Sequence, residues 1–564
     1  MLSIPALAQP QPSEHAPGWT PKQAVNARRE MVATANPLAT DAGYEILRRG
    51  GAAVDAAIAA QMVLNLVEPQ SSGIGGGAFM LVHDARQGKL IAYDGRETAP
   101  AAARSDRFLD GTGKPMHFFD AVVGGRSVGV PGALRMLELA HRRHGRLPWR
   151  TLFDAAIRLA RDGFAVSPRL HAEIAAERFL RQDRARAYFY NADGTPLAVG
   201  QRLRNPALAA TLERVASEGA DAFYSGEIAR DIVRTADEYA ANPGDLTIAD
   251  LAGYRAVVRM PACSRYRSYR VCSMPPPSSG GIAVLQILGL LERFDIKAIA
   301  SSAVMSAHLF SEAGRLAYAD RSVYVADPDF VPPLPALLDR AYLRERSQLI
   351  RLDASIGRAW AGRPPAAGNA TFGEDNALEF PSTSHISIVD RYGNAVSMTT
   401  TIEAAFGSRL MTAGGFLLNN ELTDFSFVPV QDGKPVANRV EGGKRPRSTM
   451  APTIAYDARG RIALVVGSPG GPAIANYVAK TLIAVLDRGL DPQAAVDLPN
   501  VGSRNGPVYL ERGTSAETLA PKLNALGDAT RIADQTSGIQ LIVRTPSGWR
   551  GAADPRREGT VRGD

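Results

Sequence analysis

The sequence predicts a globular protein of mixed helices and strands, of the α+β class. Apolar residues make up 45% and charged residues 21% of the 564 residues, an ordinary composition with ample core material. Apolar spacing typical of helices recurs along the chain, and two alternating, strand-like segments follow residue 383. At about 150 residues per domain, this length allows about four compact domains or fewer large ones.

The expected helices follow from the spacing of apolar residues. The alanine-rich residues 55–67 are apolar on all sides, which predicts a buried helix. Amphipathic spacing predicts helices over residues 134–144 and 152–161. Further helices are expected at 282–292, after a break of prolines and glycines, and at 473–486.

A hairpin is expected after a loose stretch at residues 361–382, which is rich in Gly, Pro, Ala and Asn. Its strands are residues 384–390 and 395–402, and Gly393 stands where a three-residue turn needs a left-handed residue. A hairpin centred on Tyr392 pairs residues whose numbers add to 784, so Thr383 lies opposite Thr401. A threonine that starts a strand and faces a second hydroxyl is an arrangement that chemistry can use.

Charge and cysteine content exclude several classes of protein. Lys and Arg exceed Asp and Glu by 64 − 57 = 7, but the arginine-rich pieces at 141–146, 178–186 and around Arg556 and Arg557 have no interleaved aromatics. They fit solvated helix faces better than nucleic-acid binding. No apolar stretch reaches the ~18–20 residues of a membrane span. Cys263 and Cys272 are too few for a disulfide framework or a structural zinc site, and the sequence leaves open whether they pair.

Residues 1–30 are expected to be a flexible N-terminus that includes the remnant of a secretory signal. Ala6-Leu7-Ala8 resembles the cleavage site of such a signal, although its basic region and full apolar stretch are missing. We therefore expect a periplasmic or secreted protein, with a cytoplasmic location left open.

Two glycine motifs match known patterns without the required context. Residues 73–78 match G-x-G-x-x-A, but a helix precedes and a strand follows, which favours close backbone packing over a dinucleotide site. Residues 125–129 match the G-x-S-x-G elbow around Ser127, but a turn follows instead of a helix. A serine hydrolase using Ser127 stays as an alternative.

A third glycine loop has the order of elements that binds an anion. A strand at 464–467 leads through Gly470 and Gly471 into the helix at 473–486, which aims backbone N–H groups at an anion. The loop lacks the Lys-Ser/Thr of a nucleotide-binding loop, so an oxyanion hole for acyl transfer fits better. A purely structural turn is an equal alternative for this loop alone.

Polar residues in three further segments would together suit an α-amino acid. Arg96 follows a tight turn and could hold a carboxylate with two parallel hydrogen bonds. Ser448 and Thr449 present adjacent hydroxyls. The polar cluster at 419–425 supplies acidic side chains for an ammonium group, directly after an apolar strand.

These segments resemble the gamma-glutamyltransferase (gamma-glutamyltranspeptidase) family of N-terminal nucleophile hydrolases, over nearly the whole chain. The matching segments are 51–77, the turn at Arg96, 127–132, 274–281, 383–390, 419–425, 444–453 and 467–471. The resemblance implies a four-layer αββα sandwich, formed jointly by the large and small subunits of a self-cleaved precursor. It places the cut between Ser382 and Thr383, so that residues 31–382 form the large subunit and 383–564 the small, catalytic subunit.

The resemblance also implies a role for each site residue. Thr383 would be the nucleophile, its freed α-amine (typical pKa ~7.7–8.0) would be its base, and Thr401 would support both. The substrate α-carboxylate would meet Arg96, Ser448 and Thr449, the α-ammonium would meet Glu403, Glu421 and Asp424, and Gly470 and Gly471 would stabilise the oxyanion. No metal or organic cofactor is implied.

The implied activity is transfer of a γ-glutamyl group from glutathione or another γ-glutamyl amide to water, an amino acid or a peptide. The nearest alternative is an acylase of the same fold that cleaves glutaryl (cephalosporin) side chains. A glutaryl group lacks the α-ammonium, so it would leave the acidic residues unpaired. The alternatives of other classes are the Ser127 hydrolase and an uncleaved, non-catalytic binding protein.

Overall fold

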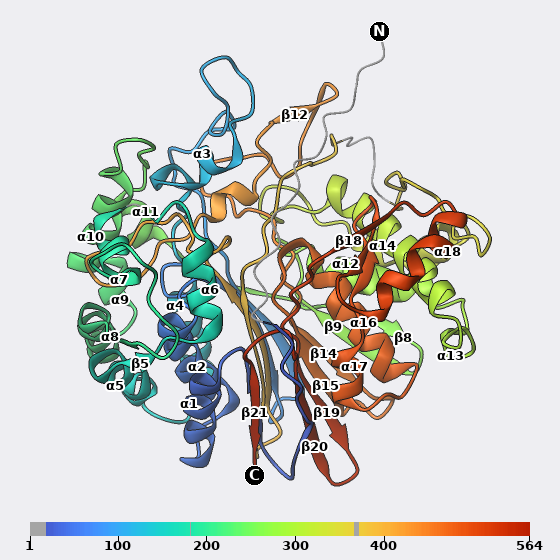
Figure 1. Ribbon diagram of the computed structural model, residues 1–564, viewed down its shortest axis with the longest axis horizontal. Helices are drawn as coiled ribbons and strands as arrows, with labels where there is room; N and C mark the ends of the chain where they lie inside the picture. Colours follow the sequence, from blue (N-terminus) through green and yellow to red (C-terminus); the bar gives the residue numbers. More distant parts are fainter. Residues whose placement is uncertain (1–17, 181, 366–371) are drawn as a thin grey trace.

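The computed structural model describes residues 18–180, 182–365 and 372–564, which form four layers (Figure 1). Two sheets lie face to face in the middle, and helices cover each outer face. The predicted αββα sandwich is therefore confirmed. Of the predicted N-terminal segment, residues 1–17 lie outside the described residues.

Both sheets have seven strands and are antiparallel throughout. The first contains, in spatial order, β1 (Val25–Ala27), β20 (Gly548–Ala553), β19 (Gln540–Thr545), β15 (Ile462–Gly467), β14 (Thr453–Tyr456), β9 (Tyr269–Ser273) and β8 (Ala262–Tyr266). The second contains β21 (Thr560–Gly563), β2 (Met31–Thr34), β10 (Ser384–Val389), β11 (Ala395–Thr401), β3 (Gly77–Asp84), β4 (Lys89–Gly95) and β7 (Val257–Arg259). Strands from before and after residue 382 thus contribute to each sheet.

The predicted hairpin is β10 and β11, and its register is confirmed, since Ser384 pairs with Thr400 and Val389 with Ala395. Alternate apolar side chains such as Ile386 pack on the helices. The polar face of β10 is buried between the two sheets, where Ser387 Oγ donates to the Gln540 carbonyl at 2.9 Å. Side chains alternate between the two faces of a strand. Since Ser387 faces the space between the sheets, an odd-numbered residue directly before β10 faces it as well.

One helical layer covers the outer face of the second sheet. It includes α1 (Pro37–Arg48), α2 (Ala53–Val67), α4 (Ala133–His144), α5 (Asp154–Asp162), α8 (Pro206–Glu218) and α10 (Gly226–Asp237). Every residue of α2 is buried, as predicted, because the helix packs between β10 and β11 on one side and α1 and α5 on the other. The two predicted amphipathic helices correspond to α4 and α5.

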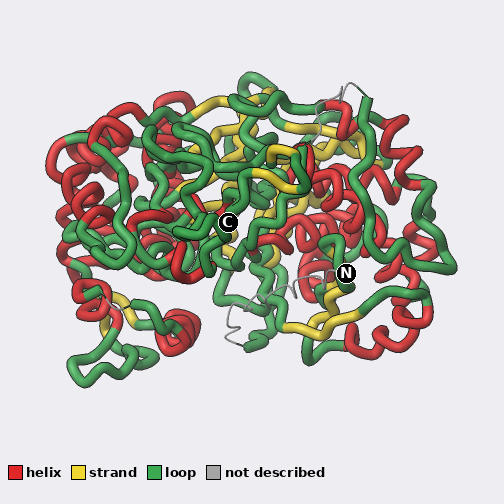
Figure 2. The backbone as a smooth tube through the Cα atoms, turned by 90° about the horizontal axis from the view of Figure 1, so that it is seen from above, coloured by secondary structure: helices red, strands yellow, loops and turns green. Residues whose placement is uncertain are grey.

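A second helical layer covers the first sheet, so that strands run between helices on both sides (Figure 2). It includes α12 (Gly280–Leu291), α14 (Ala303–Tyr324), α15 (Arg340–Ser347), α16 (Ile474–Leu486) and α17 (Pro492–Asp497). A small sheet of β16 (Val501–Ser503), β17 (Val508–Glu511) and β18 (Thr530–Ala533) adjoins this layer. Among the described residues, no helix has the length and apolar character needed to cross a membrane.

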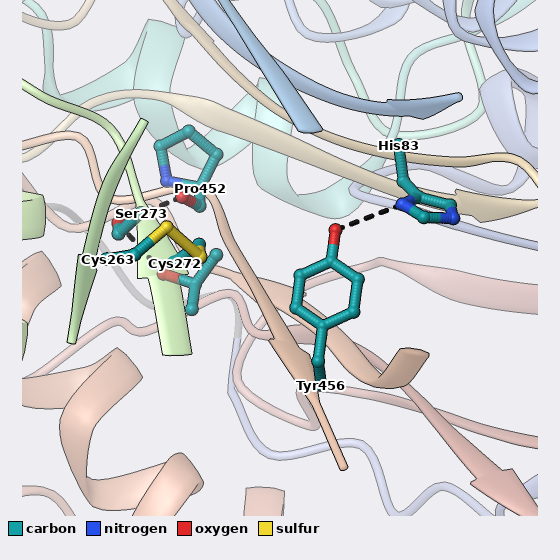
Figure 3. Close-up of a disulfide and its surroundings, with 7 residues drawn as sticks. His83, Cys263, Cys272, Ser273, Pro452 and Tyr456 are labelled. Atoms are coloured by element: carbon teal, nitrogen blue, oxygen red, sulfur yellow. Dashed lines mark hydrogen bonds between the residues drawn. A yellow bond between two sulfur atoms is a disulfide. The ribbon is translucent and has the colours of Figure 1, made fainter. Parts of the chain in front are cut away.

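Cys263 in β8 and Cys272 in β9 form a disulfide, which answers the question that the sequence left open (Figure 3). The two residues are directly paired across the strands, with Cα atoms 4.1 Å apart. In the same region, the Tyr456 hydroxyl of β14 and His83 Nδ1 of β3 are hydrogen-bonded at 3.1 Å. This bond connects the first sheet to the second.

Candidate active site

Thr383 lies directly before β10, in the space between the sheets, and faces the end of β11. Its hydroxyl is hydrogen-bonded to the carbonyl oxygen of Ser382 and lies 3.4 Å from Thr401 Oγ1. Thr401 Oγ1 donates to the same carbonyl at 3.2 Å and accepts from the backbone N–H of Glu403 at 2.9 Å. The register counted from the sequence therefore brings two hydroxyls to one carbonyl group, as an attacking oxygen and a polarising donor would require.

A cavity of about 20 Å³ adjoins Thr383 and collects nearly all the predicted site residues. Its lining includes Arg96, Ser382, Thr383, Thr401, Glu403, Glu421, Asp424, Ser448, Thr449 and Gly471, and we call it the acidic cavity. Gly470 instead lines a neighbouring hollow. A volume of about 20 Å³ has room for about one water molecule and is far below the ~300 Å³ of small-molecule pockets, so the intact chain has no room there for a substrate.

Arg96 follows β4 and is 1% exposed. Its guanidinium donates to Glu421, to Asp424 Oδ2 at 2.5 Å and to the Arg447 carbonyl at 2.8 Å. In the intact chain, the arginine expected to bind a carboxylate thus contacts two acids expected to bind an ammonium. Buried charges need such partners, so an incoming α-amino acid would exchange these contacts for contacts of the same kinds.

Three buried carboxyl groups interact with this arginine, those of Glu421, Asp424 and Glu97. Glu97 directly follows Arg96 in the sequence, and the sequence analysis missed it. Burial, reinforced by the charge of Glu421, raises the pKa of Glu403 to about 8. Burial also raises the pKa of Asp424 and of Glu97 well above the usual range, against the attraction of Arg96. Burial therefore favours the neutral, protonated form of these carboxyl groups.

Glu379, four residues before Thr383, places its carboxylate beside Thr449 and was also missed. Thr449 Oγ1 donates to Glu379 Oε2 at 2.5 Å, and Arg321 in α14 donates to both Glu379 and Thr449 Oγ1 (2.6 Å to the latter). Burial would raise the pKa of Glu379, but the charges of Arg321 and Arg447 outweigh it and lower the pKa to about 2. A carboxylate from the chain itself thus occupies part of the predicted carboxylate site.

Gly470 and Gly471 connect β15 to α16, as predicted, and lie against the segment before Thr383. Their φ angles of 134° and 52° lie in the region that favours glycine. A Cβ atom on Gly471 would lie 2.5 Å from the Phe380 carbonyl oxygen, so the close approach also requires glycine. The loop backbone reaches the segment that ends at Ser382, which is where an oxyanion hole would act.

The arginines near the C-terminus require a correction. The sequence predicts a solvated helix face, but Arg556 and Arg557 are 3% and 1% exposed and lie between β20 and β21. Arg557 donates to the Thr383 carbonyl at 3.2 Å and to the Thr536 carbonyl, which makes it a positioning residue for Thr383. Composition alone cannot distinguish such a buried arginine from a solvated one, because its carbonyl partners are distant in the sequence.

Ser127 lacks the geometry of a nucleophile. It lies in a 3₁₀ turn (Gly125–Ser127), is fully buried, and donates to the carbonyls of Val122 at 2.6 Å and Gly124 at 3.0 Å. These contacts argue against the Ser127 alternative. At the other glycine motif, a Cβ on Gly76 would lie 2.1 Å from the Thr401 carbonyl oxygen, which confirms close backbone packing.

Comparison with known proteins agrees with this geometry. The family model described as gamma-glutamyltranspeptidase matches residues 39–563. A glutathione hydrolase proenzyme of Bacillus subtilis (strain 168) is 37% identical over 556 residues, covering 96% of this chain and 92% of that protein. An acylase ACY 1 proenzyme of Pseudomonas sp. (strain V22) is 36% identical over 551 residues, covering 96% and 94%. The crystal structure of cephalosporin acylase from Bacillus halodurans matches with a TM-score of 0.82 and 28% identity, covering 100% of this chain and 99% of that one. The chain belongs to the gamma-glutamyltranspeptidase family.

Proposed function

We propose that this protein is a self-processing γ-glutamyl hydrolase and transferase with Thr383 as its nucleophile. The observation that carries the proposal is the Thr383 hydroxyl on the Ser382 carbonyl, at the wall of the acidic cavity. Donors are glutathione or other γ-glutamyl amides, and acceptors are water, amino acids or peptides. The donors share an α-amino acid end, whose two charges suit a buried arginine beside buried carboxyl groups.

Maturation begins when Thr383 Oγ1 attacks the carbonyl carbon of Ser382. The new C–O bond replaces the C–N bond, and the hydroxyl proton passes to the released nitrogen. Water then hydrolyses the ester, leaving a carboxylate on Ser382 and a free amine on Thr383. The hydrogen bond from Thr401 to the Ser382 carbonyl supports this step, because it stabilises the negative charge that develops on the oxygen. The products end at residue 382 and begin at residue 383, with 564 − 382 = 182 residues in the small subunit.

Cleavage also opens the binding site. Glu379, Phe380 and Ser382 line the acidic cavity of the intact chain, so the new end of the large subunit has to move before a substrate can enter. When Glu379 leaves, Arg321 and Thr449 are free to accept the substrate α-carboxylate, together with Ser448 and Arg96. The acidic residues Glu403, Glu421 and Asp424 then hold the α-ammonium.

In turnover, the free amine of Thr383 accepts the proton of its own hydroxyl, which attacks the γ-carbonyl of the donor. Gly470 and Gly471 stabilise the tetrahedral oxyanion. The amide nitrogen takes the proton and departs, leaving a γ-glutamyl ester on Thr383. Water or an acceptor amine attacks this ester and regenerates the enzyme.

A glutaryl acylase is the second candidate, since two of the similar proteins are named as acylases. Glutaryl and γ-glutamyl groups differ by the α-ammonium, which the acidic cavity suits and a glutaryl group does not carry. Buried acids without a cationic partner on the substrate would disfavour glutaryl binding.

We also propose that the protein works outside the cytoplasm. The Cys263–Cys272 disulfide supports this location, because disulfides persist in oxidising compartments.

The test combines intact mass with a matched pair of substrates. We expect the parent protein to give two fragments that meet at Ser382–Thr383, and the Thr383→Ala variant to stay whole. The matured parent should hydrolyse L-γ-glutamyl-4-nitroanilide at least about tenfold faster than glutaryl-4-nitroanilide, in kcat/KM. A parent that stays whole would contradict self-processing, and preference for the glutaryl compound would support the acylase.

A further inference from the structure

A hollow separate from the active site lies in the helical layer that covers the first sheet. It measures about 360 Å³, within the ~300–1,000 Å³ of pockets that bind small molecules. Its walls are α13 (Ile296–Ile299), α14, α16, the start of β16 and the 3₁₀ turn Ser515–Leu519, and the three helices lie on the right of Figure 1. Among the described residues, none lines both this hollow and the acidic cavity.

The lining of this hollow is mostly apolar, and we call it the apolar pocket. Ile296, Phe310, Ile483, Val501 and Leu519 line it from different walls. Phe310, Val501 and Leu519 are only half-buried, so part of their apolar surface is left uncovered. An apolar chain that filled the pocket would remove this surface from water, which favours binding.

The charged side chains of the lining are both cations, Lys480 in α16 and Arg488 directly after that helix. No acidic side chain of the described residues lines the pocket. Within the part of the chain that the structure describes, the half-buried side chain of Arg488 forms no hydrogen bond or ion pair. Its N–H groups are therefore available to a ligand, and a guanidinium suits a carboxylate, which can accept two parallel hydrogen bonds.

Lys480 has one donor left for a ligand. Its ammonium group donates to the Leu498 carbonyl and to Asn500 Oδ1, both at 2.8 Å, and an ammonium has three protons. Burial, together with the charge of Arg556, lowers the pKa of Lys480 to about 7, although acids such as Asp554 act in the opposite direction. An anion in the pocket would favour the charged form of this amine.

We propose that the apolar pocket binds a medium-chain carboxylate, such as a fatty acid. The carboxylate pairs with Arg488, Lys480 supplies a second positive charge, and the chain covers the apolar lining. A neutral chain would leave both cations without an anion, and a short carboxylate would leave most of the apolar surface uncovered. Binding there is independent of the proposed function, because the apolar pocket and the acidic cavity have separate linings.

Three small ligands test the proposal by calorimetry on the full-length protein: octanoate, octan-1-ol and butyrate. The titrations are made at about pH 6.5, where the amine of Lys480 is mostly protonated. We expect octanoate to bind at least about tenfold more tightly than octan-1-ol, which has no charge. Octanoate should also bind at least about tenfold more tightly than butyrate, whose chain is shorter by about four methylene groups.

Variants of the lining locate the binding. Arg488→Gln should lower the affinity for octanoate about tenfold and leave that for octan-1-ol within about twofold. Because the Arg488 side chain has no partner among the described residues, this variant should keep the melting temperature of the parent. Ala484→Leu, which fills space between the two cations, should weaken both ligands about tenfold. Arg459→Gln, on the exposed turn between β14 and β15, is the control for a general loss of positive charge and should change neither affinity more than about twofold.

Each part of the proposal has an outcome that would overturn it. Equal affinities for octanoate and octan-1-ol, or an unchanged affinity for octanoate in Arg488→Gln, would exclude recognition of the carboxylate. Equal affinities for octanoate and butyrate would show attraction of anions to the surface instead of binding in the apolar pocket. If octanoate does not bind at all, the apolar pocket is not a site for medium-chain carboxylates.

Discussion

The two hollows on either side of the segment before Thr383 differ in charge, volume and exposure to water. The acidic cavity measures about 20 Å³ and holds fully buried charges. The neighbouring hollow, which Gly470 lines together with Arg504, Arg512 and Arg531, measures about 240 Å³, and its arginines are half-buried or exposed. Charges removed from water interact strongly and tolerate no mismatch, whereas exposed pairs contribute little. The comparison predicts an enzyme that is strict about the γ-glutamyl end of its donor.

The largest effect should come from removing one buried charge of the acidic cavity. Asp424→Asn keeps the shape of the side chain but leaves the substrate ammonium and Arg96 with one carboxylate less, a change that costs about 3–5 kcal/mol in buried pairs. We expect kcat/KM for L-γ-glutamyl-4-nitroanilide to fall about 100-fold or more. Asp432→Asn, on an exposed turn of the same subunit, is the control and should change it less than about twofold. An equal loss for both variants would contradict the assignment of Asp424.

The next effect concerns the segment that separates the hollows. Thr401→Val keeps the side-chain volume but removes the hydroxyl that donates to the Ser382 carbonyl. Loss of one such donor typically costs ~10²–10³ in rate, so we expect self-cleavage to slow about 100-fold, measured as the fraction of intact chain against time. Thr400→Val is a suitable control, because Thr400 donates instead to the Gly77 carbonyl, at 3.3 Å. Equal maturation rates for parent and Thr401→Val would remove Thr401 from the cleavage mechanism.

A smaller effect concerns the pH dependence of substrate binding in the acidic cavity. Glu403, whose pKa is raised to about 8, is mostly neutral at pH 7 and gains its charge as the pH rises through that value. An ammonium binds the ionised form, so KM for γ-glutamyl donors should fall about tenfold between about pH 7 and about pH 8.5. Glu403→Gln should abolish this fall.

The smallest effect is expected for Glu379. Its carboxylate occupies the carboxylate site only before cleavage, so Glu379→Gln should leave KM and kcat of fully matured enzyme within about twofold of the parent values. Arg321→Gln removes an arginine that we propose binds the substrate α-carboxylate after cleavage, so this substitution should raise KM about tenfold. A large change in KM for Glu379→Gln would show that this segment stays in the site after cleavage.

The fold and the pairing of Thr383 with Thr401 could be predicted because they depend on local signals. Gly393, with a φ angle of 87°, fixes the turn, and the turn fixes the register of the whole hairpin. The residues named from the family resemblance, except Gly470, do gather in one cavity. Their roles in substrate binding stay predictions.

The missed residues are those whose importance arises only from contacts across the fold. Glu379 lies in a stretch with no periodicity, and its partner Arg321 lies 58 residues earlier, in the last turn of a long helix. Arg557 looks like a surface arginine in the charged sequence around it, yet its guanidinium donates to a carbonyl 174 residues away. Long-range pairing of polar groups has no sequence period, so pattern analysis cannot detect it.

The way the strands interleave has a consequence for how the matured enzyme fails. In the second sheet, β2 pairs with β10 and β21, and β11 pairs with β3, so strands from both sides of residue 382 alternate along the sheet. Once the bond before Thr383 is cut, these ladders hold two separate chains together. Melting then releases two fragments that must find each other again in solution, which makes refolding bimolecular and competes with aggregation. The lifetime of the matured enzyme is therefore set by the height of its unfolding barrier instead of by a folding equilibrium.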